Sequence, residues 1–267
     1  MLSKNYQNGL ILFSKYAFAP NTLQYCGPKE IESVFENITQ KKEEISQSSK
    51  KLLLQFTGAV PYLELIARAN NIRDIFDYRV VEAYWIGNEF LANVPAKDLY
   101  SSIADRFKDR ATLKKWNEIA PKLILGAKPF HAFHVFDIGK KVGLINLGVV
   151  KEALETINNC RIGWGKVIDR NLESSGFSIG NAIVEYYPIV IDSDNKLKIG
   201  DKTKRSFYFT DNNIRKGDKV SIHWQFICDK INTREQRNLI YWTNYHLNIT
   251  NFELMNGTGD AGVISAD

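Results

Sequence analysis

The chain has 267 residues, and its 35 lysine and arginine residues against 30 aspartate and glutamate residues give a formal charge of +5. A hydrophobic content of 44% with 24% charged residues excludes a wholly disordered chain, and the length accommodates two modest domains or one large domain. The sequence has no long apolar run, no secretory signal and no extended basic cluster, which predicts a cytoplasmic protein that binds neither membranes nor nucleic acid.

The first half of the chain has the apolar spacing of helices. Pro28 follows a glycine and opens one of these segments as a first-turn proline. The predicted helical segments are, in chain order, residues 9–18, 28–38, 52–69, 74–94, 98–107, 113–119 and 153–157. The polar residues 40–51 are expected to form an exposed turn or helix end.

After residue 158 the pattern changes to short runs of β-branched and aromatic residues separated by turn signals. The predicted strands are residues 161–169, 182–191, 196–199, 206–209 and 219–226. Five short strands favour a small closed barrel. Thr233, with Gln236 three residues later, predicts the capping of a final helix that runs to about residue 249.

These patterns predict an α+β protein in three parts. Residues 1–157 form an N-terminal all-helical domain. Residues 158–251 form a small five-stranded OB-like β-barrel with a C-terminal helix, and residues 252–267 form a flexible tail.

Three cysteines are too few for a disulfide framework, so we asked whether any of them does chemistry. Cys228, just past a predicted strand, is expected to be inert packing. Cys26 directly precedes a predicted helix, where the local positive potential lowers a thiol pKa and favours a reactive thiolate or a metal ligand. The neighbouring Tyr16 and Asn21 belong to the same group of short motifs and are candidate ligand-binding residues.

Cys160 begins a second motif. It stands five residues before a Gly-Lys-Val, and His223 ends a Gly-Asp-x-Val-x-x-His segment farther along the chain. From about residue 160 to 240 the chain resembles the HypC/HupF-type hydrogenase maturation chaperones, which are small OB-type barrels with a C-terminal helix. That family carries a Cys-x-x-x-Pro-Gly-Lys-Val motif and the same histidine-containing strand.

The resemblance implies that Cys160 is the functional cysteine and His223 the characteristic histidine. In that family the cysteine is the processed N-terminal residue and holds an iron centre with cyanide and carbon monoxide, which passes to the large subunit of a nickel–iron hydrogenase. Here Cys160 is internal, and Trp164 replaces the motif proline, where it would shield the thiol or offer a stacking surface. The plain alternative is that Cys160 is a small buried residue at the start of a strand.

The helical half carries further candidates. One segment would place a carboxylate beside aromatic rings, an arrangement that suits a pocket. In it Glu82 is a candidate acid or base, and the candidate ligand-binding residues are Tyr84, Trp85 and Asn88. The alternative for this segment is an ordinary core helix.

His131 and His134 are three residues apart, a spacing that brings two imidazoles to one side of a helix. Together with Cys26, and with Glu82 as a further candidate, they would form a ligand set for iron or another transition metal if the fold brings them together. The alternative is aromatic core packing in which each histidine bonds to the backbone.

Several segments also resemble a bacterial and archaeal family of unknown function that spans nearly the whole length. The shared segments are Tyr-Ala-x-x-Pro-Asn, Cys-Gly-Pro, Glu-Ala-Tyr-Trp-x-Gly-Asn and His-x-Phe-His-Val-Phe. This resemblance implies one two-part protein and supplies no activity.

The favoured hypothesis is a chaperone-like accessory protein in the maturation of a nickel–iron hydrogenase-type metalloenzyme. It would bind a metal fragment or client protein through a cysteine–histidine site, and its partner would be a client metalloenzyme subunit or another maturation protein. The alternatives are a protein-binding adaptor without metal and an enzyme with a cleft site between the two halves. The motifs favour a protein that is not an enzyme.

Overall fold

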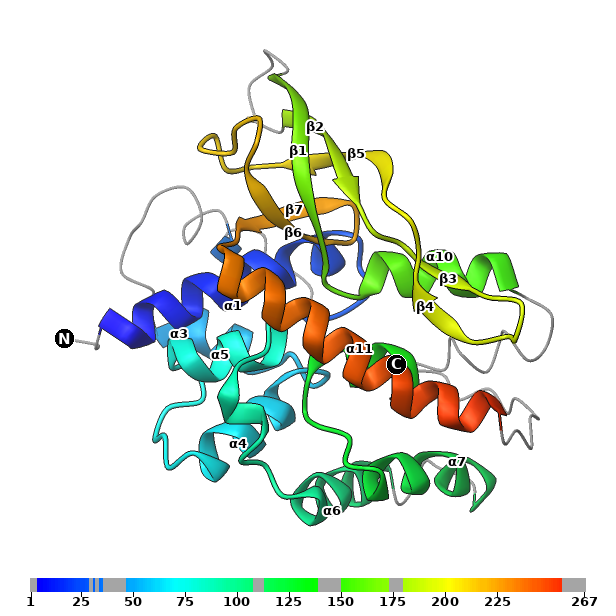
Figure 1. Cartoon of the computed structure of the whole chain (residues 1–267). Helices are drawn as coiled ribbons and strands as arrows, with labels where there is room; N and C mark the ends of the chain where they lie inside the picture. Colours follow the sequence, from blue (N-terminus) through cyan, green and yellow to red (C-terminus); the bar gives the residue numbers. More distant parts are fainter. Residues whose placement is uncertain are drawn as a thin grey trace.

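The computed structural model describes residues 4–28, 31, 34–35, 47–107, 113–138, 150–172 and 180–255. Helices formed by the first part of the chain lie on one side, a β-barrel lies on the other, and the last helix runs across both (Figure 1). The predicted α+β class, with N-terminal helices, a five-stranded barrel and a C-terminal helix, is confirmed.

The described helices before the barrel are α1 (Lys4–Thr22), α3 (Gln47–Leu53), α4 (Val60–Ala69), α5 (Tyr78–Trp85), η2 (Glu89–Leu91), α6 (Ala96–Phe107), α7 (Leu113–Ile124), α8 (His131–Phe133), the π-helical turn η3 (His134–Ile138) and α10 (Val150–Cys160). The predicted helix over 28–38 falls largely outside the described residues. Helix α1 extends beyond its predicted end and contains Pro20.

Two long predicted helices are each divided. The segment 52–69 breaks before α4, which has a proline in its first turn. The segment 74–94 leaves the helical path at Gly87, whose φ is +87°. A side chain could not replace this glycine, because an added Cβ would lie 2.1 Å from the indole of Trp242.

The barrel is formed by β1 (Gly163–Leu172), β2 (Gly180–Tyr186), β5 (Thr203–Phe209), β6 (Lys219–His223) and β7 (Phe226–Lys230). The strand order is β1-β2-β5-β7-β6, closed by pairing of β6 with β1. All pairs are antiparallel except β5 with β7. The interior is filled by Val167, Ala182, Val184, Phe207, Phe209, Ile214, Val220, Ile222 and Ile227.

Two strand predictions were wrong in detail. Residues 182–191 form β2 and the separate β3 (Ile189–Ile191), and β3 pairs with β4 (Leu197–Ile199) in a hairpin outside the barrel. The fifth barrel strand is β7, which was not predicted. The strand expected over 219–226 covers β6, the turn and only the first residue of β7. The tight turn between them uses Trp224 and Gln225 at φ 47° and 68°, so it lacks the glycine or asparagine that normally marks such a turn.

The end of α10 and the start of the final helix also differ from the predictions. Cys160 is the last residue of α10 and does not begin a strand. The final helix α11 (Thr233–Met255) is capped by Asn232 and Glu235, where Thr233 and Gln236 were expected. The Asn232 side chain accepts from the backbone N–H of Glu235, and the Glu235 carboxylate accepts from the N–H of Asn232, which is a capping box.

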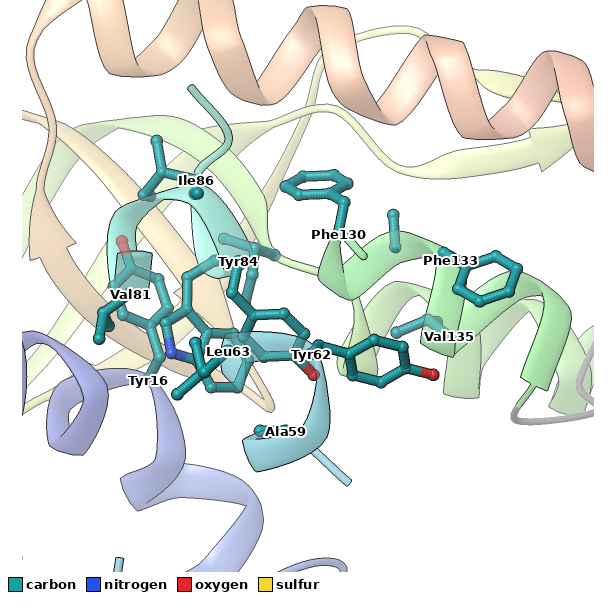
Figure 2. Packing of buried hydrophobic residues seen from close by; sticks show 14 of the residues in the cluster. Tyr16, Ala59, Tyr62, Leu63, Val81, Tyr84, Ile86, Phe130, Phe133 and Val135 are labelled. Carbon is teal, nitrogen blue, oxygen red and sulfur yellow. The ribbon is translucent and has the colours of Figure 1, made fainter. Parts of the chain in front are cut away.

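The main hydrophobic core joins the two halves. It contains residues of the helices together with Ile162 and Trp164 of the barrel side and Leu239 and Trp242 of α11. Figure 2 shows part of it, where tyrosines of α4 and α5 lie near phenylalanines of the α8 segment. Among the described helices, none is both long enough and apolar enough to cross a membrane.

Candidate metal centre

Three side chains from distant parts of the chain converge where the helices meet the barrel. His131 begins α8, Cys160 ends α10 and His223 ends β6. One potential ligand atom from each side chain lies within 4.8 Å of the other two. Both histidines are buried, and the cysteine is partly buried.

His223 has a defined tautomer. Its Nδ1 lies 2.7 Å from the backbone carbonyl oxygen of Tyr16. A carbonyl only accepts hydrogen bonds, so the proton is on Nδ1 and the lone pair is on Nε2. Nε2 is buried and has no hydrogen-bond partner in the described protein. A histidine whose N–H is held by a carbonyl while its other nitrogen stays available has the usual arrangement of a metal ligand.

Pro20 explains why the Tyr16 carbonyl is available. In a regular helix this carbonyl would accept the N–H of residue 20, but proline has none. The carbonyl instead accepts from His223. The proline in α1 therefore frees the acceptor that orients a residue 207 positions away in sequence.

Both ring nitrogens of His131 have partners. Nε2 lies 2.8 Å from the carbonyl oxygen of Cys160, and Nδ1 lies 3.1 Å from the hydroxyl of Tyr84. With Nε2 protonated toward the carbonyl, Nδ1 accepts from the tyrosine. The hydroxyl can also accept from Nδ1, so Tyr84 supports either tautomer of His131.

Trp85 forms an apolar wall beside the two imidazoles. Its ring centroid lies 4.7 Å from that of His131 and 5.7 Å from that of His223, and it stacks on Tyr16 at 5.6 Å. Burial lowers the pKa of His223 to about 4. Burial, followed by the neighbouring His223 and His134, lowers the pKa of His131 well below its usual value. Both imidazoles are therefore neutral near pH 7, the state that binds metals.

His134 lies beside the three-residue group. Its ring is stacked 6.3 Å from that of His131, and its Nδ1 lies 3.5 Å from the hydroxyl of Tyr62. Tyr62 in turn stacks on Tyr84 at 5.7 Å, so two tyrosine–histidine pairs lie side by side. Burial lowers the pKa of His134 to about 4.

Cys26 is exposed and does not belong to the group of three. The amide of Asn21 shapes its loop by donating to the carbonyls of Cys26 and Pro28 at 3.0 and 2.8 Å. Desolvation raises the pKa of the Cys26 thiol to about 11, the opposite direction to the one expected for a cysteine before a helix. Most of the residues from 29 to 46, which follow this loop, lie outside the described part of the chain.

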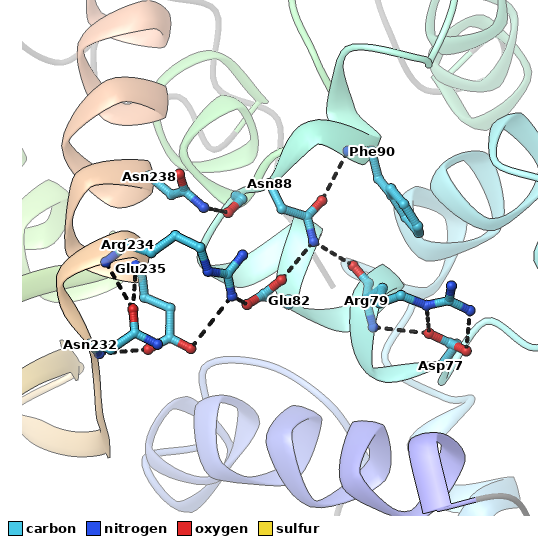
Figure 3. Close-up of polar contacts among 10 residues, drawn as sticks. Asp77, Arg79, Glu82, Asn88, Phe90, Asn232, Arg234, Glu235 and Asn238 are labelled. Carbon is cyan, nitrogen blue, oxygen red and sulfur yellow. Dashed lines mark hydrogen bonds and ion pairs between the residues drawn. The ribbon is translucent and has the colours of Figure 1, made fainter.

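Glu82 also lies outside the group of three. Its carboxylate pairs with Arg234 of α11 and accepts from the amide of Asn88 at 2.8 Å (Figure 3). The same amide donates to the carbonyl of Arg79 at 2.9 Å. Glu82 and Asn88 therefore join α5 to α11 and the following turn.

Trp164, the remaining predicted ligand-binding residue, is buried on β1 beside Tyr187 and under the guanidinium of Arg161. Sequence reasoning missed Pro20, although a proline inside an apolar helical pattern was a visible signal. It also missed Arg161, whose type and position gave no such signal.

The fold and the site define an α+β protein with a buried cysteine–histidine group at the contact between helices and a barrel. The chain belongs to a family of unknown function, DUF6390, which matches residues 5–257. No curated protein and no solved structure matches the chain significantly.

Proposed function

We propose that this protein binds a transition-metal ion through His131, Cys160 and His223 and serves as an accessory protein in metalloenzyme maturation. The convergence of the three ligand atoms within 4.8 Å is the observation that carries the proposal. Thiolate and imidazole ligands together suit iron and other transition metals of soft to borderline character.

The hydrogen bonds around the site support this assignment. His223 offers Nε2 directly. His131 offers Nε2 when its proton moves to Nδ1, which then donates to the hydroxyl of Tyr84. In this tautomer Nε2 gives up its hydrogen bond to the carbonyl of Cys160 and binds the metal in its place. Each imidazole then donates its N–H to an oxygen of the protein, as metal-bound histidines normally do.

The maturation role rests on the cysteine and histidine motifs of the barrel half. Cys160 and His223 are the two positions that the HypC-type pattern singles out, and they lie in one cluster. In the proposed role, a cytoplasmic protein holds a metal fragment and delivers it to a client metalloenzyme subunit of the nickel–iron hydrogenase type.

A metalloenzyme is the second candidate. Three protein ligands leave a coordination position for water or substrate, as in catalytic zinc sites. The site also lies between the two halves of the chain, where an enzyme cleft was expected.

The first experiment measures metal binding by the anaerobically purified protein. We expect one equivalent of iron or cobalt per chain, with a thiolate-to-metal absorption band for cobalt, and its loss in Cys160→Ser and His223→Gln. Cys228→Ser is the matched control, because Cys228 is a buried thiol outside the cluster. Thermal unfolding confirms that each variant is folded. Full metal occupancy in both cluster variants would disprove the site.

A second experiment separates the two candidate roles. The metal-loaded protein is mixed with a metal-free precursor of a nickel–iron hydrogenase large subunit, the two proteins are separated, and the metal content of each is measured. Transfer of metal to the precursor supports the maturation role. Retention of the metal together with turnover of a substrate supports the enzyme.

A further inference from the structure

Arg161, the residue after Cys160, is a buried cation without an anionic partner among the described residues. Only 1% of its surface is exposed. One guanidinium nitrogen, Nη2, donates to the carbonyl of Tyr187, whereas Nε and Nη1 have no hydrogen-bond partner in the described protein. Its guanidinium carries five N–H donors, so most of its bonding capacity is unused.

Such an arrangement is costly, because a buried charge normally has a counter-ion and hydrogen bonds for its remaining donors. Lys122 follows this rule: it is also buried, and its ammonium lies 2.9 Å from the carboxylate of Asp137. Burial lowers the pKa of Arg161 to about 10, so the guanidinium is still charged near pH 7.

Trp164 and Gly163 are the neighbours that decide what could approach the guanidinium of Arg161. The indole of Trp164 lies 5.2 Å from the guanidinium carbon and covers one face. Gly163 has no side chain, and even an added Cβ would lie at an ordinary contact distance of 3.8 Å from Nη1 and Nη2. A group placed beside Gly163 would therefore meet the Nη1 and Nη2 edge of the guanidinium without a steric clash.

We propose that Arg161 binds a small monoanionic carboxylate, of the size of formate or acetate, along this edge. A planar carboxylate can accept two parallel N–H bonds from a guanidinium. One negative charge balances the single buried positive charge, whereas a phosphate or sulfate dianion would leave an excess. This site is separate from the proposed metal function and does not depend on it.

The test is thermal unfolding of the full chain in chelator, with sodium formate compared with sodium chloride and sodium sulfate at equal ionic strength. We expect a saturable rise of a few degrees in the unfolding temperature with formate alone. Arg161→Met abolishes the rise. Arg170→Met preserves it, because Arg170 also bonds a backbone carbonyl and covers an aromatic ring but is only partly buried.

The stability of the variants without carboxylate provides a second measurement. Arg161→Met is expected to unfold at the same or a higher temperature than the wild type, because it removes an unpaired buried charge. Arg161→Lys keeps the positive charge but loses the planar guanidinium that can donate two parallel hydrogen bonds. The formate concentration that gives half of the rise in unfolding temperature therefore increases at least about tenfold. An equal response to chloride and formate, or an unchanged formate response in Arg161→Met, would overturn the proposal.

Discussion

The imidazole rings of His131 and His223 meet edge to face with their centroids 5.2 Å apart. One ring comes from the helical half and the other from the barrel, so the candidate metal centre exists only when the two halves are in contact. The hydroxyl of Tyr84 holds His131, and the backbone carbonyl of Tyr16 holds His223. Both rings are therefore in position without a metal.

Pro20→Ala tests the role of the proline in α1. The new N–H competes with His223 for the carbonyl of Tyr16, so we expect metal affinity to fall about tenfold, as for the loss of other groups that orient a ligand. The unfolding temperature stays equal or rises, because alanine is a far better helix residue than proline. Competition with a chelator and thermal unfolding measure the two effects.

Pro121→Ala is the control for this variant, because Pro121 also lies inside a helix, α7, and no ligand of the site depends on it. It should leave the metal affinity unchanged. Equal affinity of the two variants would contradict the role assigned to Pro20.

Tyr84→Phe tests the support of His131. The variant removes the hydroxyl that lies 3.1 Å from Nδ1 and leaves the stacked ring in place. We expect metal affinity to fall about 10- to 100-fold with the fold intact. Tyr62→Phe removes the hydroxyl that lies beside His134 and should lower metal affinity less than Tyr84→Phe does. A larger loss of affinity in Tyr62→Phe than in Tyr84→Phe would place the metal at His134.

Acid should destabilise the metal-free protein. Burial lowers the pKa of His246 to about 3, and its two ring nitrogens have no hydrogen-bond partner in the described protein. Below its ordinary pKa of 6.5 the unfolded chain binds a proton that the folded chain does not, so stability falls as the pH falls. His246 alone should remove about 2 kcal/mol between pH 7 and pH 5. Denaturant unfolding in chelator measures this loss.

His246→Leu should weaken this pH dependence and leave the stability at pH 7 equal or higher. The remaining three histidines act in the same direction, because burial lowers the pKa of each. A pH dependence identical to that of the wild type would show that folding does not change the pKa of His246.

Glu82→Gln should affect stability and leave metal binding unchanged. The substitution removes the ion pair with Arg234 and keeps an acceptor for Asn88. We expect a loss of about 1–2 kcal/mol, since a hydrogen bond to a charged partner is lost while Arg234 remains hydrated. Asp77→Asn is the control. Its carboxylate is more exposed than that of Glu82, so its pair with Arg79 should contribute less than about 1 kcal/mol, and asparagine remains a good helix cap. Reduced metal content in Glu82→Gln would assign the carboxylate to the site.

The sequence predicted most helices and the barrel, because apolar spacing and turn residues act locally. It did not predict β7, since the turn through Trp224 and Gln225 uses residues that rarely adopt positive φ. It named all three members of the cluster among six candidates for metal or acid–base chemistry. It could not separate them from Cys26 and His134, because long-range packing decides which side chains meet.

Helix α11 connects both halves through contacts near its two ends. Arg234 near its start pairs with Glu82, and the Asn251 side chain near its end bonds both the N–H and the carbonyl of Leu197 in the outer hairpin. This helix follows the barrel in the chain, so these contacts form only after the barrel residues have left the ribosome. Closing such distant contacts is slow compared with local folding. The newly made protein therefore completes the contacts between its helices and the outer hairpin late, after the barrel has been synthesised.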